Sequence, residues 1–150
     1  MKKKEFKDLE FIEGGVCAAQ GFLANGVHRG LKVGGDPNKN DLAMIYAKVP
    51  CAAAAMYTTN KVQGAPIQVT KAHLKDGTAR AVIVNSVNAN TCNADGVEKA
   101  EKMCELTANA LGLKPEDVIV ASTGVIGQPL PIDPIIQGKI GRASCGKECR

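Results

Sequence analysis

The sequence reads Val118-Ile-Val-Ala-Ser122-Thr123-Gly124-Val-Ile-Gly127 where an apolar, β-branched run opens into a hydroxyl pair and two glycines. The run from Val118 to Ala121 predicts a buried strand. Gly124 and Gly127 allow the backbone after this strand to bend and to bring N–H groups close to a ligand. Hydroxyl and amide donors fixed there can stabilise negative charge on a carbonyl oxygen, by about 3 kcal/mol per donor in acyl-transfer enzymes. A Ser-Thr-Gly turn is most often only a turn, so these residues alone leave both interpretations open.

The preceding segment contains a second apolar run, Arg80–Val84, which predicts a central strand. A polar loop with four asparagines, Asn85–Asn93, follows it. Small and apolar residues then recur every three to four positions, which predicts one helix between Asp95 and Leu111 with Gly112 as its stop. Strand, loop, helix and strand in this order predict an α/β fold in layers, with its two polar loops at corresponding strand ends.

The other expected elements are less regular. Asp95 and Glu98 have the spacing of a capping box, which predicts that the Asp95 side chain caps the long helix. Pro50 and Cys51 interrupt an apolar region and predict two neighbouring strands on either side of them. These strands and two short helices that begin near prolines are expected at Leu42–Val49, Ala52–Thr58, Ile67–Leu74 and Asp133–Ile136.

Composition limits the classes of partner. The 150 residues are 45% hydrophobic, enough for one core. The net charge of +4 comes largely from Lys2–Lys4 and from the segment after Lys139, and only 3% of the residues are aromatic. We therefore expect no nucleic-acid partner and no membrane partner. No apolar run reaches the length of a membrane span, and the lysine-rich start lacks a signal-peptide core, so a cytoplasmic location is expected.

No cofactor or metal site is expected. The glycine-rich segment Gly14–Gly26 has neither the ending of a phosphate-binding loop nor the spacing of a dinucleotide fingerprint. Of the six cysteines, the first four are scattered and predict reduced, partly buried thiols. Cys145 and Cys149 have three residues between them and no nearby histidine, which argues against zinc.

Six segments carry a family resemblance, in chain order Ala24–Lys32, Asp41–Ile45, Tyr57–Val62, Ala65–Ile67, Val84–Asn90 and Ala121–Gly127. Together they resemble the N-terminal part of the ornithine acetyltransferase family, the bifunctional glutamate N-acetyltransferases of arginine biosynthesis. The resemblance predicts three segments: an N-terminal tail at 1–12, a partial domain of this family at 13–140, and an irregular tail at 141–150. The last segment stops resembling the family, as after a truncation or a frameshift.

The resemblance implies the fold of self-processing N-terminal-threonine acyltransferases. It implies transfer of an acetyl group from N-acetylornithine to glutamate, and in some members also from acetyl-CoA as a substrate. The family cleaves its own precursor, and the new N-terminal threonine of the downstream β chain becomes the nucleophile in a hetero-oligomer of α and β chains. The α-amine of such a threonine, with a pKa near 8, can act as general base. The family's oxyanion role then falls on the Thr123 hydroxyl and the Gly124 N–H.

One departure from the family limits the expected activity. The sequence ends before the self-cleavage motif, and none of its other threonines (Thr58, Thr59, Thr91 and Thr107) has the surroundings of the nucleophile. The isolated chain is therefore expected to be inactive. Two alternatives stay open, an amidohydrolase or aminopeptidase of the related self-processing fold and a non-catalytic remnant or interaction module.

The remaining polar residues are expected to have structural or solvated roles. Asn85, Asn88 and Asn90 are expected to hold their loop through side-chain to backbone hydrogen bonds. His28 and His73 are expected at the surface, because no carboxylate lies at a useful spacing in the sequence. Arg29 and Lys61 can attract the carboxylates of glutamate, but a lone basic residue beside a turn is most often solvated.

Overall fold

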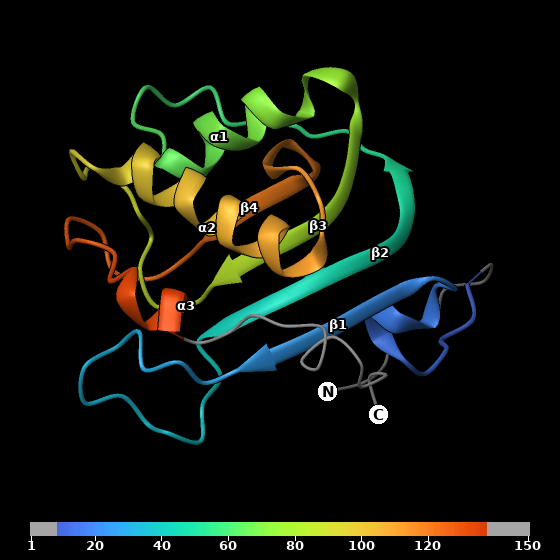
Figure 1. The fold of residues 1–150 in the computed structure, drawn as a ribbon, viewed down its shortest axis with the longest axis horizontal. Coiled ribbons are helices and arrows are strands. Elements are labelled where there is room, and N and C mark those ends of the chain that lie inside the picture. Colours follow the sequence, from blue (N-terminus) through green and yellow to red (C-terminus); the bar gives the residue numbers. More distant parts are fainter. Residues whose placement is uncertain (1–8, 138–150) are drawn as a thin grey trace.

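A computed structural model describes residues 9–137 and contains one four-stranded sheet with helices packed on it (Figure 1). The sheet has the order β1-β2-β3-β4, in which β1 and β2, and β2 and β3, are antiparallel while β3 and β4 are parallel. The strands are β1 (Phe22–Val27), β2 (Leu42–Ala52), β3 (Thr78–Asn85) and β4 (Val118–Ser122), and the helices are α1 (Ala65–His73), α2 (Gly96–Leu111) and α3 (Asp133–Gln137). The predicted α/β class is confirmed. Within the described residues, no helix is long and apolar enough to cross a membrane.

The core lies between the sheet and the pair α1 and α2. These two helices pack against each other and against β4. In β3, every second residue is buried, and Ile83 is 0% exposed, as is Met103 of α2. This alternation follows from the two-residue period of a strand, which turns one set of side chains toward the helices. The predicted central strand is therefore confirmed, with β2 on one side of it and β4 on the other.

The helix α2 has the predicted core face but a different N-terminal contact. Its buried residues are Gly96, Ala100, Met103, Cys104, Thr107, Ala108 and Leu111. Gly112 ends the helix with φ of 68°, a left-handed conformation that glycine adopts without strain. The prediction that Asp95 caps the helix through its side chain is wrong. Its carboxylate instead forms an ion pair with Lys99 Nζ at 2.8 Å, one helical turn further on, and this hydrogen bond lowers the pKa of Asp95.

The region around Pro50 forms one strand instead of the predicted two. β2 continues through Pro50 to Ala52, with a register shift against β3 between Tyr46 and Cys51. The guanidinium of Arg80 in β3 lies at this irregularity and donates to the carbonyl of Lys48 at 2.8 Å and to the hydroxyl of Tyr46 at 3.0 Å. A bulge accommodates proline because the local N–H is not needed for pairing. The alanine-rich residues that follow, 53–58, form no strand.

His73 is buried, so its predicted surface position is wrong. It is the last residue of α1, is 7% exposed and contacts α2 and β4. Its Nδ1 is 2.8 Å from the carbonyl oxygen of Val118, and its Nε2 is 3.1 Å from a carboxylate oxygen of Glu101. Thr70 of the same helix donates to the carbonyl of Val120 at 3.1 Å. β4 is the strand at one edge of the sheet, and side chains of α1 thus provide hydrogen-bonding partners for two of its main-chain carbonyl groups.

The four cysteines that the structure describes carry free thiols, as predicted. Cys104 is buried in α2, while Cys92 is exposed and Cys17 and Cys51 are half-buried. Burial raises the pKa of the Cys104 thiol to about 12, and the nearby carboxylates of Glu101 and Glu105 contribute to the shift. Cys145, Cys149 and the predicted irregular tail at 141–150 lie outside the described residues.

Candidate active site

The candidate site lies where β3 and β4 end. Their parallel pairing places Asn85 opposite Ser122, so the loops that follow the two strands leave the sheet at the same end of the strands (Figure 1). An isolated bridge between Asn88 and Val125 continues the pairing beyond the strand ends. The predicted meeting of the two polar loops is therefore confirmed.

Thr123 and Gly124 present two adjacent donors on the turn after β4. Both residues are exposed. The N–H of Thr123 donates to the carbonyl of Asn85 at 3.0 Å, and the N–H of Val125 donates to the carbonyl of Val87 at 3.0 Å. Between these two fixed points, the Thr123 hydroxyl and the Gly124 N–H have no hydrogen-bond partner among residues 9–137. Two free donors on a fixed backbone are the arrangement that an oxyanion requires.

Gly124 occupies a position that no other residue fits. Its φ is +136°, which L side chains rarely adopt. A Cβ atom there would lie 2.0 Å from the carbonyl oxygen of Val87 and 2.6 Å from the nitrogen of Asn88. The turn after β4 and the loop after β3 are therefore in direct backbone contact at this glycine.

The asparagines of the loop after β3 are buried and hold its backbone, as predicted. Asn85 and Asn90 are 0% exposed and Asn88 is 4% exposed. The Asn88 side-chain amide donates to the carbonyl of Gln128 at 2.8 Å, and its oxygen accepts the N–H of Asn90 at 2.7 Å. Asn90 in turn donates to the carbonyl of Gly96 at 2.8 Å, at the start of α2. The loop is thus tied to the turn after β4 on one side and to α2 on the other.

A second polar segment, the loop between β1 and β2, is organised by Asp41. Its carboxylate accepts the N–H of Arg29 at 2.7 Å and that of Leu31 at 2.9 Å. Its side chain is buried, and Nδ1 of His28 lies 3.5 Å away. The expectation that His28 has no carboxylate partner is therefore wrong, because the chain reverses direction between β1 and β2 and brings Asp41 back to His28.

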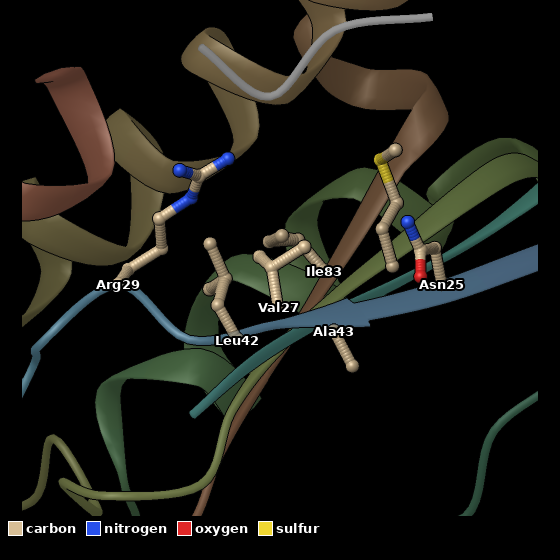
Figure 2. A pocket seen from close by; sticks show the side chains of 7 residues that line it. Asn25, Val27, Arg29, Leu42, Ala43 and Ile83 are labelled. Carbon is tan, nitrogen blue, oxygen red and sulfur yellow. The ribbon is translucent and has the colours of Figure 1, made fainter. Parts of the chain in front are cut away.

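Arg29 lies above a small cavity beside this loop (Figure 2). The cavity measures about 20 Å³, which holds a water molecule and is too small for an amino-acid substrate. Apolar side chains dominate its lining, which comprises Asn25, Val27, Arg29, Leu42, Ala43, Met44 and Ile83. A larger hollow of about 380 Å³ is lined by residues that include His28, Lys32 and Lys39. It extends to Ser86 and Val87, and Val87 is the residue whose carbonyl lies against Gly124.

Replacing Asp41 with alanine is expected to lower the free energy of unfolding by about 3 kcal/mol, because two N–H groups would lose a buried carboxylate acceptor. Urea unfolding of the chain measures this difference. Asp36→Ala is the matched control in the same loop, since Asp36 is exposed and, within residues 9–137, its carboxylate accepts hydrogen bonds from Asn38 alone. The control is expected to change stability by about 0.5 kcal/mol at most. Equal effects of the two variants would contradict the role of Asp41.

Potential ligands for a metal are dispersed. Within residues 9–137, no three His, Cys, Asp or Glu side chains gather closely enough to hold a metal ion. His28 and Arg29 line a shallow hollow together with Asp133 of α3, whereas Lys61 is exposed on a separate segment. The described structure therefore brings the loop asparagines to Thr123 and Gly124. Within residues 9–137 it shows no hydrogen bond or ion pair from Arg29 or Lys61 to these residues.

The fold defines a class of chain, an α/β layer with two donors directly after a paired strand end, the Thr123 hydroxyl and the Gly124 N–H, that have no partner among residues 9–137. Donors of this kind can hold an oxyanion. The chain belongs to the ArgJ family, whose model matches residues 23–145. This membership confirms the resemblance to the ornithine acetyltransferases.

Relatives and solved structures agree with this assignment. The chain is 46% identical over 131 residues to the arginine biosynthesis bifunctional protein ArgJ of Symbiobacterium thermophilum, covering 87% of this chain and 32% of the relative. It is 50% identical over 118 residues to ArgJ 1 of Clostridium acetobutylicum, covering 78% and 28%. The chain thus spans about a third of the length of these curated relatives.

Two crystal structures share the fold. The ArgJ protein of Bacillus halodurans superimposes with a TM-score of 0.78 at 41% identity, covering 85% of this chain and 66% of that one. The ornithine acetyltransferase of Mycobacterium tuberculosis, solved in complex with ornithine, has a TM-score of 0.76 at 38% identity, covering 84% and 67%. The layered fold expected for the N-terminal part of this family is therefore confirmed.

Proposed function

We propose that this chain forms the N-terminal portion of a glutamate N-acetyltransferase of arginine biosynthesis, which moves an acetyl group from N-acetylornithine to glutamate. The observation that carries the proposal is a pair of donors after β4, the Thr123 hydroxyl and the Gly124 N–H, to which the described part of the chain offers no partner. Membership of the ArgJ family and the similarity to an ornithine acetyltransferase solved with ornithine support it. Residues 13–140 are assigned to this portion.

The proposed reaction passes through an acetyl-threonine. The hydroxyl of an N-terminal threonine on the downstream chain attacks the acetyl carbonyl of N-acetylornithine, and the threonine's own α-amine takes the hydroxyl proton. The carbonyl oxygen gains negative charge and accepts hydrogen bonds from the Thr123 hydroxyl and the Gly124 N–H. The C–N bond then breaks, the proton passes to the departing amine, and ornithine leaves. The amine of glutamate attacks the acetyl-threonine through a second oxyanion at the same place and gives a proton to the threonine's α-amine. The ester C–O bond then breaks, the proton returns to the threonine oxygen, and N-acetylglutamate leaves.

The two donors supply the part of catalysis that belongs to this chain. Each fixed donor contributes about 3 kcal/mol to stabilising a tetrahedral oxyanion in acyl transfer. Main-chain hydrogen bonds of Thr123 and Val125 hold the backbone on either side of the Gly124 N–H. The downstream chain contributes the nucleophile, and the two chains assemble as a hetero-oligomer in the cytoplasm. No resident cofactor or metal enters this reaction, and acetyl-CoA is a candidate second acetyl donor.

A grafted enzyme tests this function. In it, residues 9–137 of this chain replace the matching part of the Mycobacterium tuberculosis ornithine acetyltransferase, and the unmodified host is the control. We expect the grafted enzyme to transfer acetyl from N-acetylornithine to glutamate within about tenfold of the host's kcat/KM, a loss of about 1.4 kcal/mol at most. Release of acetate without transfer to glutamate would favour the amidohydrolase alternative. A folded grafted enzyme that does neither would contradict the proposal.

A further inference from the structure

We propose that Asn85 is a positioning residue for acetyl transfer, which holds the backbone that carries the Thr123 hydroxyl and the Gly124 N–H without touching the substrate. This inference rests on the proposed function and adds a residue to its machinery. Asn85 is the last residue of β3, it is 0% exposed, and it lies opposite Ser122. Its side chain and its main chain both reach the turn that carries the two donors.

The orientation of the Asn85 side-chain amide is determined by its neighbours. Its Oδ1 accepts two main-chain hydrogen bonds, from the N–H of Val87 at 3.2 Å and from that of Asn88 at 2.9 Å. Because N–H groups donate only to the oxygen, the Nδ2 group must face the other way. There it donates to the hydroxyl oxygen of Ser122 at 2.7 Å. The residue directly before Thr123 is therefore held by a partly buried hydrogen bond in which Asn85 is the donor.

The main chain of Asn85 holds the next peptide. Its carbonyl accepts the N–H of Thr123 at 3.0 Å. The Asn85 side chain also holds the N–H of Val87, and the carbonyl of Val87 accepts the N–H of Val125 at 3.0 Å. One residue thus positions both flanks of Gly124, the peptide before it directly and the peptide after it through Val87. The Gly124 N–H lies in the peptide between these two and has no hydrogen-bond partner among residues 9–137.

Loss of the Asn85 side chain would act on the rate more than on substrate binding. Alanine at 85 would leave the N–H groups of Val87 and Asn88 without their acceptor and the Ser122 hydroxyl without its donor. The loop would then settle into a different backbone arrangement, and the two donors would move relative to the oxyanion. An interaction made only in the transition state lowers kcat when it is lost and leaves KM nearly unchanged.

The test measures kcat and KM of the grafted enzyme with Asn85→Ala and with Ser122→Ala. Asn85→Ala is expected to lower kcat about 30-fold, and Ser122→Ala about fivefold, with KM within about threefold in both. Asn38→Ala is a control, because the Asn38 side-chain amide also donates a local loop hydrogen bond, to Asp36 Oδ1 at 3.2 Å, but is exposed between β1 and β2. Met103→Val is a second control that destabilises the core without contacting the turn. Both controls are expected to keep kcat within about twofold.

A spectroscopic measurement on this chain keeps the inference testable where an active enzyme is not obtained. In a ¹H–¹⁵N spectrum, Ser122→Ala and Asn85→Ala are expected to shift the Thr123 and Gly124 amide signals, whereas Asn38→Ala leaves them in place. Unshifted Gly124 signals would overturn the inference. So would kcat within about twofold of the unsubstituted grafted enzyme in both variants, or a kcat loss that Met103→Val reproduces. In these cases the proposed function stands if the unsubstituted grafted enzyme still transfers acetyl.

Discussion

Replacing Gly124 with alanine is expected to lower acetyl transfer by the grafted enzyme at least about 100-fold and to lower the free energy of unfolding by about 3 kcal/mol. The added methyl group would lie 2.0 Å from the carbonyl oxygen of Val87, at a φ of +136° that alanine avoids. Contact at this distance requires the loop after β3 or the turn after β4 to move. The movement would take the Gly124 N–H away from the oxyanion. Steady-state kinetics and urea unfolding measure the two effects.

Gly127→Ala is the matched control for this prediction. Gly127 lies in the same turn and also has a positive φ, +76°, but no atom lies within 4 Å of a Cβ built on it. It is expected to cost about 1 kcal/mol of stability from backbone strain and to keep kcat within about threefold. If Gly124→Ala behaves like Gly127→Ala, the close backbone contact at Gly124 does not shape the site.

Replacing Thr123 with alanine is expected to lower kcat of the grafted enzyme about 100-fold, the effect of removing one oxyanion donor. Stability should change by about 0.5 kcal/mol at most, because the side chain is exposed and its hydroxyl has no partner among the described residues. Thr123→Ser keeps the hydroxyl and is expected to retain kcat within about tenfold. Equal kcat for the alanine variant and the unsubstituted enzyme would show that the Thr123 hydroxyl does not act on the oxyanion.

Elements encoded by local patterns could be predicted from the sequence. Continuous apolar residues identify β3 and β4, and the spacing of small and apolar residues identifies the buried face of α2. Gly112 marks the end of α2 because the left-handed conformation there favours glycine. The parallel arrangement of β3 and β4 follows from the helix between them. Because the strands are parallel, both polar loops lie at the same end of the sheet.

Features that depend on distant partners could not be predicted. β2 passes through Pro50 because Arg80, 30 residues further on, bonds to the carbonyl groups of the bulge. His73 is buried because Glu101 meets it across the interface of α1 and α2. The local pattern predicted a strand break at Pro50 and solvent exposure of His73. In both cases, a side chain from another element stabilises the opposite arrangement. Tertiary contacts of this kind override local propensity.

The candidate site could be predicted from the sequence only in part. Glycines and hydroxyl residues after an apolar run identified Thr123 and Gly124, and the abundance of asparagine indicated a loop held by its own side chains. The direction of the Asn85 amide could not be predicted, because it depends on the register that sets Asn85 opposite Ser122. The role of Asp41 was also missed. Asp41 lies directly before β2 and 12 residues after Arg29, and no repeating pattern in the sequence links these two residues.

The central claim is that Thr123 and Gly124 of this chain stabilise the oxyanion formed during acetyl transfer. The most direct measurement is the single-turnover rate at which the grafted enzyme takes an acetyl group from N-acetylornithine, followed by mass spectrometry of the downstream chain. The acetylated threonine is expected to form about 100-fold more slowly in Thr123→Ala than in the unsubstituted grafted enzyme, with the same final extent. Equal rates of acetylation in the two proteins would contradict the claim.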